Sequence, residues 1–309
     1  MSLTRAVNDL NDACRPTRRV PTRHFVIEEC KVAYVCNPGA SSTALRWLLA
    51  AIGGLAPEAF VRSTGTAATR RETVQDNRRW GSIVRPRSGV IPELARLSEA
   101  DGWFVFTVVR DPRERVWAAW QAKVLRGDPR MLANEDLRRW IPDAPRTPAD
   151  VIGPFTDFVR ALATGTAGAI ARDPYFRPQT ETITRPGLSY TQVYDRSQIA
   201  RLLADLANHL ERLGRPRNLP YQPGPRLPFA LSRTVLTDQV AGDIKDAYAA
   251  DFAAFGHAWP DEPLLADEDW DRAGYGAVDF VRAANERIAD LSGLLRPASS
   301  PDPEGAGRV

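Results

Sequence analysis

Two strand–loop–helix units are the feature that most limits the folds open to this chain. Each unit begins with a run of β-branched and aromatic residues, which is typical of a buried strand. The first run covers residues 31–36 (KVAYVC) and the second covers residues 102–109 (GWFVFTVV). A polar turn and an apolar helical stretch follow each run, at 44–52 and 113–125. Strands that alternate with helices predict an α/β fold with a mostly parallel sheet.

The rest of the chain extends this pattern. Residues 189–194 alternate as a strand, and residues 197–213 form an amphipathic helix. We also expect a modest helix at 155–163, an extended, proline-broken segment at 173–186 and a last long helix at 238–255. The sequence therefore predicts a sheet flanked by helices along most of its length.

A single α/β domain is expected over residues 30–292. Residues 1–29 are basic and predicted to be an irregular lead-in, and residues 293–309 are of low complexity and predicted to be disordered. Of the 309 residues, 43% are hydrophobic and 26% are charged, as is ordinary for a chain with a well-formed core.

Charge, cysteines and hydropathy narrow the classes of function. The net charge of +3 is too balanced for a protein held mainly by a nucleic-acid backbone, so we expect no nucleic-acid partner. Cys14, Cys30 and Cys36 lack CxxC spacing and paired histidines, so neither a disulfide framework nor a metal site is expected. The polar first twenty residues do not resemble a signal peptide, and the apolar run 47–56 is too short for a bilayer. We therefore expect a cytoplasmic protein without membrane insertion; its oligomeric state stays open.

The first loop, residues 37–43 (NPGASST), is made of small residues between a strand and a helix. Such a loop presents backbone N–H groups at a helix N-terminus, where the helix dipole favours an anion. Ser41, Ser42 and Thr43 add hydroxyl donors. Similar loops also cap helices that bind no ligand. The loop lacks the GK[ST] ending of a Walker A motif, which argues against a nucleoside triphosphatase.

The second loop begins with Arg110, at the carboxyl end of a predicted strand. Open α/β sheets bind ligands at this edge, and a planar guanidinium suits a phosphate. Asp111 is placed to cap the next helix, and Pro112 suits its first position. Arg115, one turn further, could pair with Asp111 or reach an anion. The alternative is a surface cap with an internal Asp–Arg pair.

Together these segments resemble sulfotransferases that use 3′-phosphoadenosine 5′-phosphosulfate (PAPS), above all the carbohydrate-sulfotransferase (sulfotransferase family 2) branch. Residues 106–123 (FTVVRDPRERVWAAWQAK) resemble its 3′-phosphate segment, V-R-D-P-x-x-R-L-x-S-A-Y-x-x-K. Residues 37–49 (NPGASSTALRWLL) resemble its 5′-phosphosulfate loop, P-K-x-x-S-T-x-L. Residues 173–180 (DPYFRPQT) are similar to a D-x-H-[FW]-x-P-Q segment, and residues 193–195 and 248–256 also fit the branch.

The resemblance implies a P-loop-like sheet of the sulfotransferase type. It implies that PAPS binds and that its sulfuryl group passes to a hydroxyl or amine of a glycan or small metabolite, without a metal. The residues that it places around the 5′-phosphosulfate are Gly39, Ala40, Ser41, Ser42 and Thr43. The 3′-phosphate falls to Arg110 and to the position of Ala118.

Three positions depart from the pattern of that branch. Its lysine falls at Gly39, its serine at Ala118 and its histidine at Tyr175. Because the lysine stabilises charge on the leaving oxygen, Arg46 is a candidate substitute, and we expect Gly39→Lys to raise any sulfuryl-transfer rate. The departures also support an alternative, a repurposed or inactive protein of this fold that binds a nucleotide without sulfuryl transfer.

The general base is not identified by the sequence. His24 precedes the first strand and is the histidine nearest to the first loop in the sequence. The other candidates are His209, His257, Glu72 and Asp76. A base must lie within hydrogen-bond reach of the acceptor, which a sequence does not reveal. Trp80, which flanks the arginine-rich middle segment, is a candidate for lining an acceptor pocket.

Overall fold

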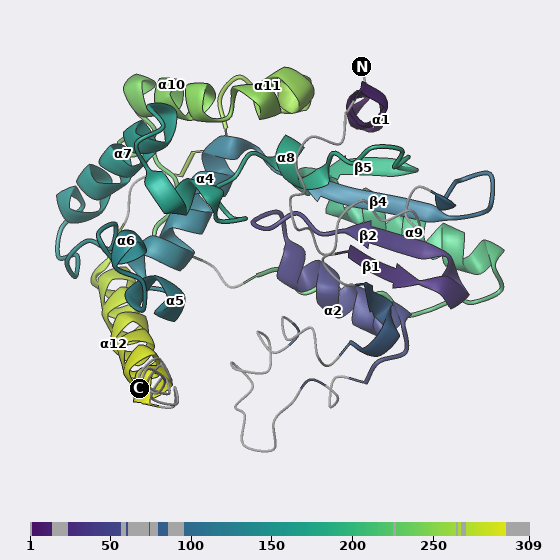
Figure 1. Ribbon diagram of the computed structural model, residues 1–309, viewed down its shortest axis with the longest axis horizontal. Helices are drawn as coiled ribbons and strands as arrows, with labels where there is room; N and C mark the ends of the chain where they lie inside the picture. Colours follow the sequence, from purple (N-terminus) through teal and green to yellow (C-terminus); the bar gives the residue numbers. More distant parts are fainter. Residues whose placement is uncertain are drawn as a thin grey trace, which may run out of the picture.

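The computed structural model describes residues 2–13, 24–56, 60, 74, 80–85, 96–224, 227–263, 265–266 and 270–294. A β-sheet with helices on both faces lies beside a second group of helices (Figure 1). Both expected strand–loop–helix units are present, and the α/β class is confirmed. No helix in these ranges is both long and apolar enough to cross a membrane.

Five strands form the described sheet, in the spatial order β3-β1-β2-β4-β5. They are β1 (His24–Ile27), β2 (Val32–Val35), β3 (Val84–Arg85), β4 (Phe104–Val109) and β5 (Gln192–Asp195). β2, β4 and β5 run parallel, whereas β1 is antiparallel to both β2 and β3. The sheet is therefore mixed, and the expectation of a mostly parallel sheet is wrong on the side of β1 and β3. The cause is a tight hairpin between β1 and β2, whose short turn can join only antiparallel strands.

The expected irregular lead-in is also wrong, because residues 3–13 form helix α1 (Leu3–Ala13) beside β5 (Figure 1). The Thr4 hydroxyl accepts a hydrogen bond from the Val193 backbone N–H at 2.9 Å. The Asn8 side chain exchanges two hydrogen bonds with the Tyr190 backbone, at 2.8 and 3.0 Å. α1 therefore satisfies backbone groups along β5, as a neighbouring strand would. Asparagine is unfavourable inside helices, so the asparagines of this segment indicate a loop in the sequence. In the structure they face the edge of the sheet.

Helices cover the two faces of the sheet through separate cores. One face, which includes Tyr34, packs against α2 (Ser42–Ile52) and α9 (Ile199–Arg212). The other face packs against α1, α8 (Gln179–Ile183) and α11 (Ala249–Phe255). α8 lies within the segment that was expected to be extended, so that expectation is wrong for its five residues. The result is a three-layer arrangement with the sheet in the middle.

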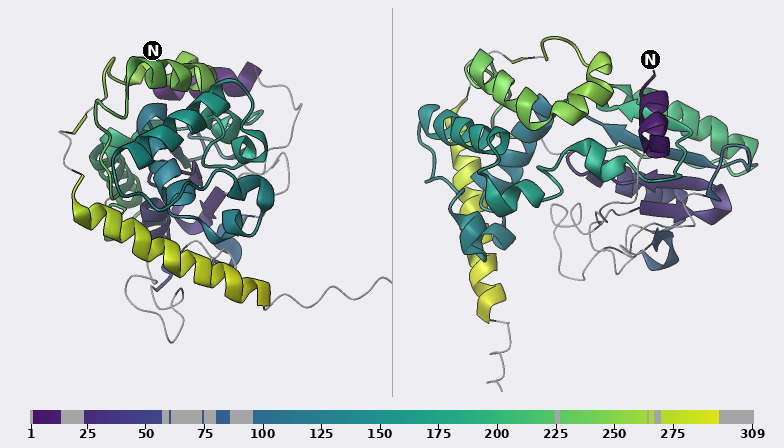
Figure 2. Two further views of the ribbon diagram at one scale, coloured as in Figure 1. Left: turned by 90° about the vertical axis from the view of Figure 1, so that its left-hand side faces the viewer. Right: turned by 45° about the horizontal axis from the view of Figure 1, so that its top comes forward.

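The second group of helices packs around its own core, to one side of the sheet (Figures 1 and 2). Its helices are α4 (Pro112–Trp120), α5 (Pro129–Leu132), α6 (Glu135–Arg138), α7 (Ala149–Ala163), α10 (Asp238–Ala247) and α12 (Arg272–Leu294). α4 joins the two parts, because it starts just after β4 and buries Trp117 and Trp120 in this core. The long helix expected at 238–255 is interrupted at Tyr248 and becomes α10 and α11. α12 was not expected; it reaches Leu294, and the rest of the expected disordered tail lies outside the described residues.

Candidate anion-binding site

The loop of residues 37–41 connects β2 to α2 and contains two residues with positive φ. Gly39 has a φ of 86° and Ser41, the residue that precedes α2, has a φ of 60°. Residues that carry a Cβ atom are disfavoured at positive φ. Backbone strain of this kind tends to concentrate at functional sites. Within the described residues the backbone N–H groups of Gly39, Ser41 and Ser42 have no hydrogen-bond partner. The loop thus places unpaired donors at the positive end of α2.

The five expected loop residues are not equally accessible. Ala40 is fully buried, and its N–H donates to the Asn37 carbonyl at 3.2 Å. Ser42 is buried, whereas Gly39, Ser41 and Thr43 are half-buried. The part of this loop that a ligand could approach therefore centres on Gly39 and Ser41.

Arg110 follows the last residue of β4 and reaches the first loop. Its Nη1 donates to the Gly39 carbonyl at 3.4 Å, and its Nε donates to Glu114 Oε2 at 3.1 Å. Burial lowers the pKa of Arg110 to about 10, so the guanidinium keeps its positive charge at neutral pH. The two loops that the sequence suggests as anion-binding segments are therefore adjacent in the fold.

A second arginine shares the same carboxylate. Arg196 follows β5, and its Nη1 lies 3.4 Å from Glu114 Oε2. Arg110 and Arg196 thus extend from the ends of neighbouring parallel strands, and a single Glu114 faces both of them. Two guanidinium groups and one carboxylate leave a net positive charge, which suits a phosphate. Arg196 was not among the candidates from the sequence, although its place directly after a predicted strand indicates a position where open sheets bind ligands.

Gln179 is the residue that ties the two loops together. Its Oε1 accepts hydrogen bonds from Asn37 Nδ2 and from the Arg110 backbone N–H, both at 2.9 Å. Its Nε2 donates to the Arg110 carbonyl at 2.8 Å. The side chain is completely buried, so these bonds do not compete with solvent. Gln179 belongs to a segment that carries the resemblance, but no role was expected for it from the sequence.

Asp251 supports Gln179 from the opposite side. This buried carboxylate accepts hydrogen bonds from the backbone N–H groups of Gln179 and Thr180, each at 2.8 Å. It therefore caps the N-terminus of α8, where a negative charge is favourable. Asp251 lies in α11, within residues 248–256. The four segments that carry most of the resemblance consequently meet around one polar network.

Asp111 caps α4, as the sequence predicts, but its ion-pair partner is Arg113. Asp111 Oδ1 accepts from the Arg113 backbone N–H at 2.8 Å, and Asp111 Oδ2 lies 2.7 Å from Arg113 Nη2. Arg115 neither pairs with Asp111 nor stays available for an anion. Its guanidinium is fully buried and donates to the carbonyls of Pro38, Arg177 and Pro174 at 2.9–3.0 Å. Arg115 therefore clamps the first loop to the segment before α8.

The remaining expected site residues lie in different surroundings. Ala118 is half-buried on α4 and carries no side-chain donor. Arg46 is only 5% exposed, with its Nη2 3.5 Å from Cys36 Sγ, just where β2 ends. His24 is 1% exposed in β1, opposite Val35 of β2. Its burial keeps it from an acceptor that arrives from solvent, which argues against His24 as the general base.

The other candidates for the base or the acceptor pocket divide into buried, exposed and undescribed residues. Trp80 is 1% exposed within the core under α2, which argues against a place for it in an acceptor pocket. His209 is buried as well, whereas His257 is exposed after α11. Glu72 and Asp76 lie outside the described residues.

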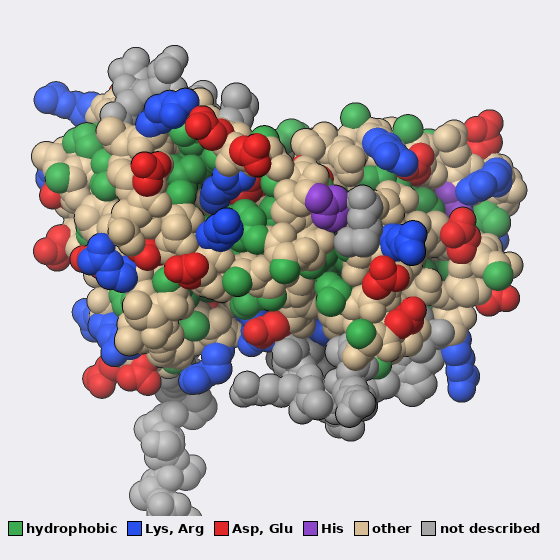
Figure 3. Space-filling model, turned by 90° about the horizontal axis from the view of Figure 1, so that it is seen from above, with side chains coloured by type: hydrophobic (Ala, Val, Ile, Leu, Met, Phe, Trp, Pro, Cys, Tyr) green, Lys and Arg blue, Asp and Glu red, His purple; other side chains and the backbone are tan. Residues whose placement is uncertain are grey.

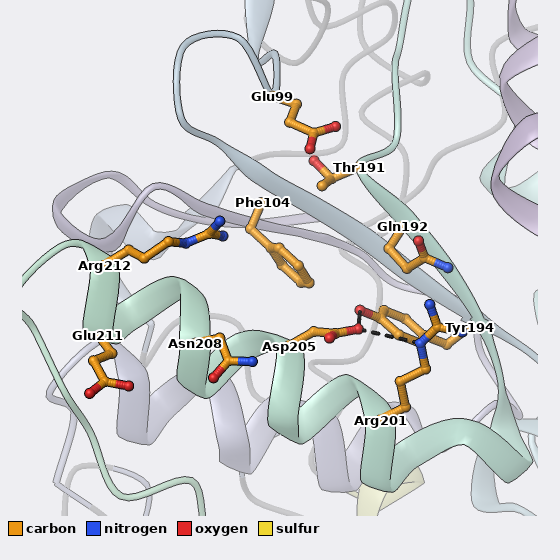
Figure 4. Close-up of a pocket in the computed structure, with 10 residues that line it drawn as sticks. All are labelled: Glu99, Phe104, Thr191, Gln192, Tyr194, Arg201, Asp205, Asn208, Glu211 and Arg212. Carbon is orange, nitrogen blue, oxygen red and sulfur yellow. Dashed lines mark hydrogen bonds and ion pairs between the residues drawn. The ribbon is translucent and has the colours of Figure 1, made fainter.

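A separate groove of about 630 Å³ runs along α9 (Figure 4). Its lining residues are Glu99, Phe104, Thr191, Gln192, Tyr194, Arg201, Asp205, Asn208, Glu211 and Arg212. The Tyr194 hydroxyl donates to Asp205 at 2.8 Å, and Arg201 Nε lies 3.6 Å from the same carboxylate. Both acidic and basic side chains line the groove, and neither loop of the anion-binding site contributes to it. We therefore treat it as a distinct feature.

The surface and the comparisons with other proteins add little evidence for a function beyond that of the two loops. On the face seen in Figure 3, Lys and Arg side chains are interspersed with Asp and Glu. Among the described residues no group of three or more His, Cys, Asp or Glu side chains could hold a metal ion. No family model, curated protein or solved structure matches the chain. Any inference about function therefore rests on the geometry of the two loops.

Proposed function

We propose that this protein binds PAPS and transfers its sulfuryl group to a hydroxyl or amine. The observation that carries the proposal is the junction of Arg110 with the first loop, at the Gly39 carbonyl. PAPS has two anionic ends, a 5′-phosphosulfate and a 3′-phosphate. In this proposal the unpaired N–H groups of the loop bind the first end and Arg110 binds the second. Gln179 holds both binding elements in one fixed arrangement.

The reaction itself would need positioning more than covalent help. The bond between sulfur and the 5′-phosphate oxygen breaks, a bond from sulfur to the acceptor oxygen or nitrogen forms, and the acceptor proton passes to a base. 3′-phosphoadenosine 5′-phosphate then leaves with the additional negative charge. By analogy with phosphoryl transfer, stabilising this charge is the main catalytic task. Backbone N–H groups of Gly39, Ser41 and Ser42 are suited to it.

The proposal also covers the type of fold, the class of acceptor and the cellular compartment. The parallel strands β2, β4 and β5, with the loop after β2, would form a P-loop-like nucleotide site of the sulfotransferase type. The acceptor would be a glycan or a small metabolite, and the reaction would take place in the cytoplasm.

Nucleotide binding without sulfuryl transfer is the second candidate, and Gly39 favours it. The resemblance places a lysine at this position, but glycine offers no cation for the leaving oxygen. Arg115, whose Nε would lie 3.3 Å from a Cβ atom at Gly39, already donates to three backbone carbonyls. A chain with this site could therefore bind the nucleotide and lack the charge that drives transfer.

Calorimetry with 3′-phosphoadenosine 5′-phosphate tests the donor site. We expect the wild-type protein to bind it, and Arg110→Ala to weaken binding about tenfold or more. Arg201→Ala is the matched control, because Arg201 is an exposed arginine that pairs with Asp205 in the groove. AMP, which lacks the 3′-phosphate, should bind more weakly, and its affinity should be the same for the wild-type protein and for Arg110→Ala. If the wild-type protein does not bind the 3′-phosphorylated nucleotide, the proposal is wrong.

Turnover separates the two candidate functions. Release of 3′-phosphoadenosine 5′-phosphate from PAPS should depend on the presence of an acceptor, tested with glycans, phenols and amines. Tight binding without acceptor-dependent release across such a panel would favour the second candidate.

A further inference from the structure

Arg46 is a buried cation without a counter-ion in the described structure. Its side chain is almost completely enclosed, and its Nε and Nη1 atoms have no hydrogen-bond partner among the described residues. Its Nη2 has a polar contact, at 3.5 Å from Cys36 Sγ, and the guanidinium lies 5.5 Å from the centre of the Phe25 ring. Within the described residues no aspartate or glutamate pairs with it.

The Tyr34 hydroxyl, which lies near Arg46, does not neutralise the charge of Arg46. An arginine stays protonated even when it is buried. Within the described residues the Tyr34 hydroxyl lacks a hydrogen-bond partner as well, and burial raises the pKa of Tyr34 well above its usual value, so this phenol remains neutral. An ionised group in such surroundings is unfavourable for the free protein unless something else supplies the opposite charge.

The guanidinium of Arg46 lies at the base of the anion-binding loop. Cys36, which it contacts, directly precedes residue 37 of that loop. Arg46 itself belongs to the first half of α2, the helix that the loop opens. Side chains on a helix lean toward its N-terminus, which fits this contact. Its charge therefore adds to the positive end of α2, in a medium that screens poorly.

We propose that the counter-ion of Arg46 is the oxyanion bound by residues 37–43. Arg46 then acts from beneath the loop as a positioning residue, through its electrostatic field, and does not touch the substrate. For the nucleotide this inference rests on the proposed function, with the 5′-phosphosulfate as the oxyanion. Arg46 would supply the positive charge that Gly39 lacks. The free protein would carry an unfavourable charge that binding of the anion relieves.

Arg115 provides a matched control in the same region. It is a second buried arginine next to the loop, but each of its three guanidinium nitrogens donates to a backbone carbonyl. Removing this satisfied guanidinium leaves three backbone carbonyls without the donors they now have, so it should destabilise the protein. Removing an unsatisfied one should have the opposite effect on the free protein, since a buried charge can often be replaced by an apolar group with a gain in stability.

The experiment compares Arg46→Met, Arg46→Lys and Arg115→Met by thermal unfolding and calorimetry. Without anion, Arg46→Met is expected to raise Tm and Arg115→Met to lower it. Arg46→Met should weaken binding of 3′-phosphoadenosine 5′-phosphate about tenfold. Arg46→Lys should retain most of that affinity. Inorganic sulfate, compared with chloride at equal ionic strength, should raise the Tm of the wild-type protein more than that of Arg46→Met.

A free Arg46→Met protein that is less stable than wild type, or that binds the anions as well as wild type, would overturn the inference. A thiolate absorbance that Cys36→Ala abolishes would also overturn it, since Cys36 would then be the counter-ion. Failure of the proposed function looks different: the wild-type protein would not bind the nucleotide, while the sulfate comparison would still decide the role of Arg46. A wild-type protein that sulfate stabilises no more than Arg46→Met contradicts the role of Arg46 whatever the nucleotide does.

Discussion

Arg115 lies directly against Gly39. A Cβ atom on Gly39 would stand 3.1 Å from Arg115 Cγ and 3.3 Å from Arg115 Nε. The φ of 86° at Gly39 is a second obstacle to any side chain. The structure therefore gives a reason for glycine here, and it reverses the expectation that Gly39→Lys would raise a transfer rate. A lysine at this position would disturb the loop that it was meant to assist.

Gly39→Ala is predicted to destabilise the protein by about 1–2 kcal/mol, because alanine is unfavourable at positive φ. Urea unfolding measures the loss. Gly54→Ala is the control, since Gly54 also has a positive φ, of 69°, but has no atom within 4 Å of its would-be Cβ. The difference between the two variants then reports the contact with Arg115. Equal losses would show that Arg115 moves aside freely. We also expect Gly39→Lys to weaken nucleotide binding.

The local parts of this site could be predicted from sequence, because local patterns specify them. The apolar runs before Gly39 and Arg110 are strands, and Asp111 and Pro112 begin a helix, as expected. These features depend on residues within one or two turns of each other. A single sequence was therefore enough to locate both loops and to suggest that they share a sheet edge.

The contacts that join the loops could not be predicted in the same way. Gln179 is 142 residues from Asn37 and 69 from Arg110, and no local pattern specifies such partners. α1 was missed because Asn8 faces the β5 edge, where a polar residue takes the place of an apolar one. The lack of a hydrogen-bond partner for Arg46 is likewise a property of packing, which composition and periodicity do not record.

Gln179→Met should show how much the network around the loops contributes. Methionine keeps the length of the side chain but removes the partners of the Arg110 backbone N–H and carbonyl and one of the two acceptors of Asn37 Nδ2. We expect a loss of about 2–4 kcal/mol in the free energy of unfolding. Gln192→Met is the control, because Gln192 lies at the groove and makes only a 3.4 Å contact with the Val193 carbonyl. A loss no larger than that of the control would contradict the role given to Gln179.

Glu114→Gln is predicted to strengthen binding of 3′-phosphoadenosine 5′-phosphate about threefold. The carboxylate of Glu114 faces both Arg110 and Arg196, so it competes with a phosphate for the same guanidinium groups. Calorimetry at low and moderate salt measures the effect, which salt should reduce. The control is Glu181→Gln, because Glu181 pairs with an arginine outside this cluster, Arg177, at 3.8 Å. Weaker binding by Glu114→Gln would mean that the carboxylate orients the arginines and does not compete.

Arg196→Ala tests the second arginine separately. We expect it to weaken binding of the 3′-phosphorylated nucleotide about threefold to tenfold and to leave AMP binding unchanged, because in the proposed arrangement the 3′-phosphate is the group that faces the arginine pair. Arg212→Ala serves as the control, since Arg212 lines the groove along α9. If Arg196→Ala weakens AMP binding as strongly, then Arg196 acts on the fold or on the whole surface potential.

Asp128 gives the protein a predicted acid-sensitive contribution to stability. Burial raises the pKa of Asp128, but Lys123, with its Nζ 2.6 Å away, and Arg130 outweigh burial and lower that pKa to about 2. The folded protein therefore binds a proton here less readily than the unfolded chain, in which this aspartate has its ordinary pKa of 3.8. The stabilisation is complete above about pH 5 and is lost as the pH falls through 3.8 toward 2; it amounts to roughly 2 kcal/mol. Urea unfolding from pH 6 to pH 2.5 measures it, and Asp128→Asn should be less stable at pH 6 but lose less stability on acidification. Parallel pH profiles for the two proteins would contradict the assignment to Asp128.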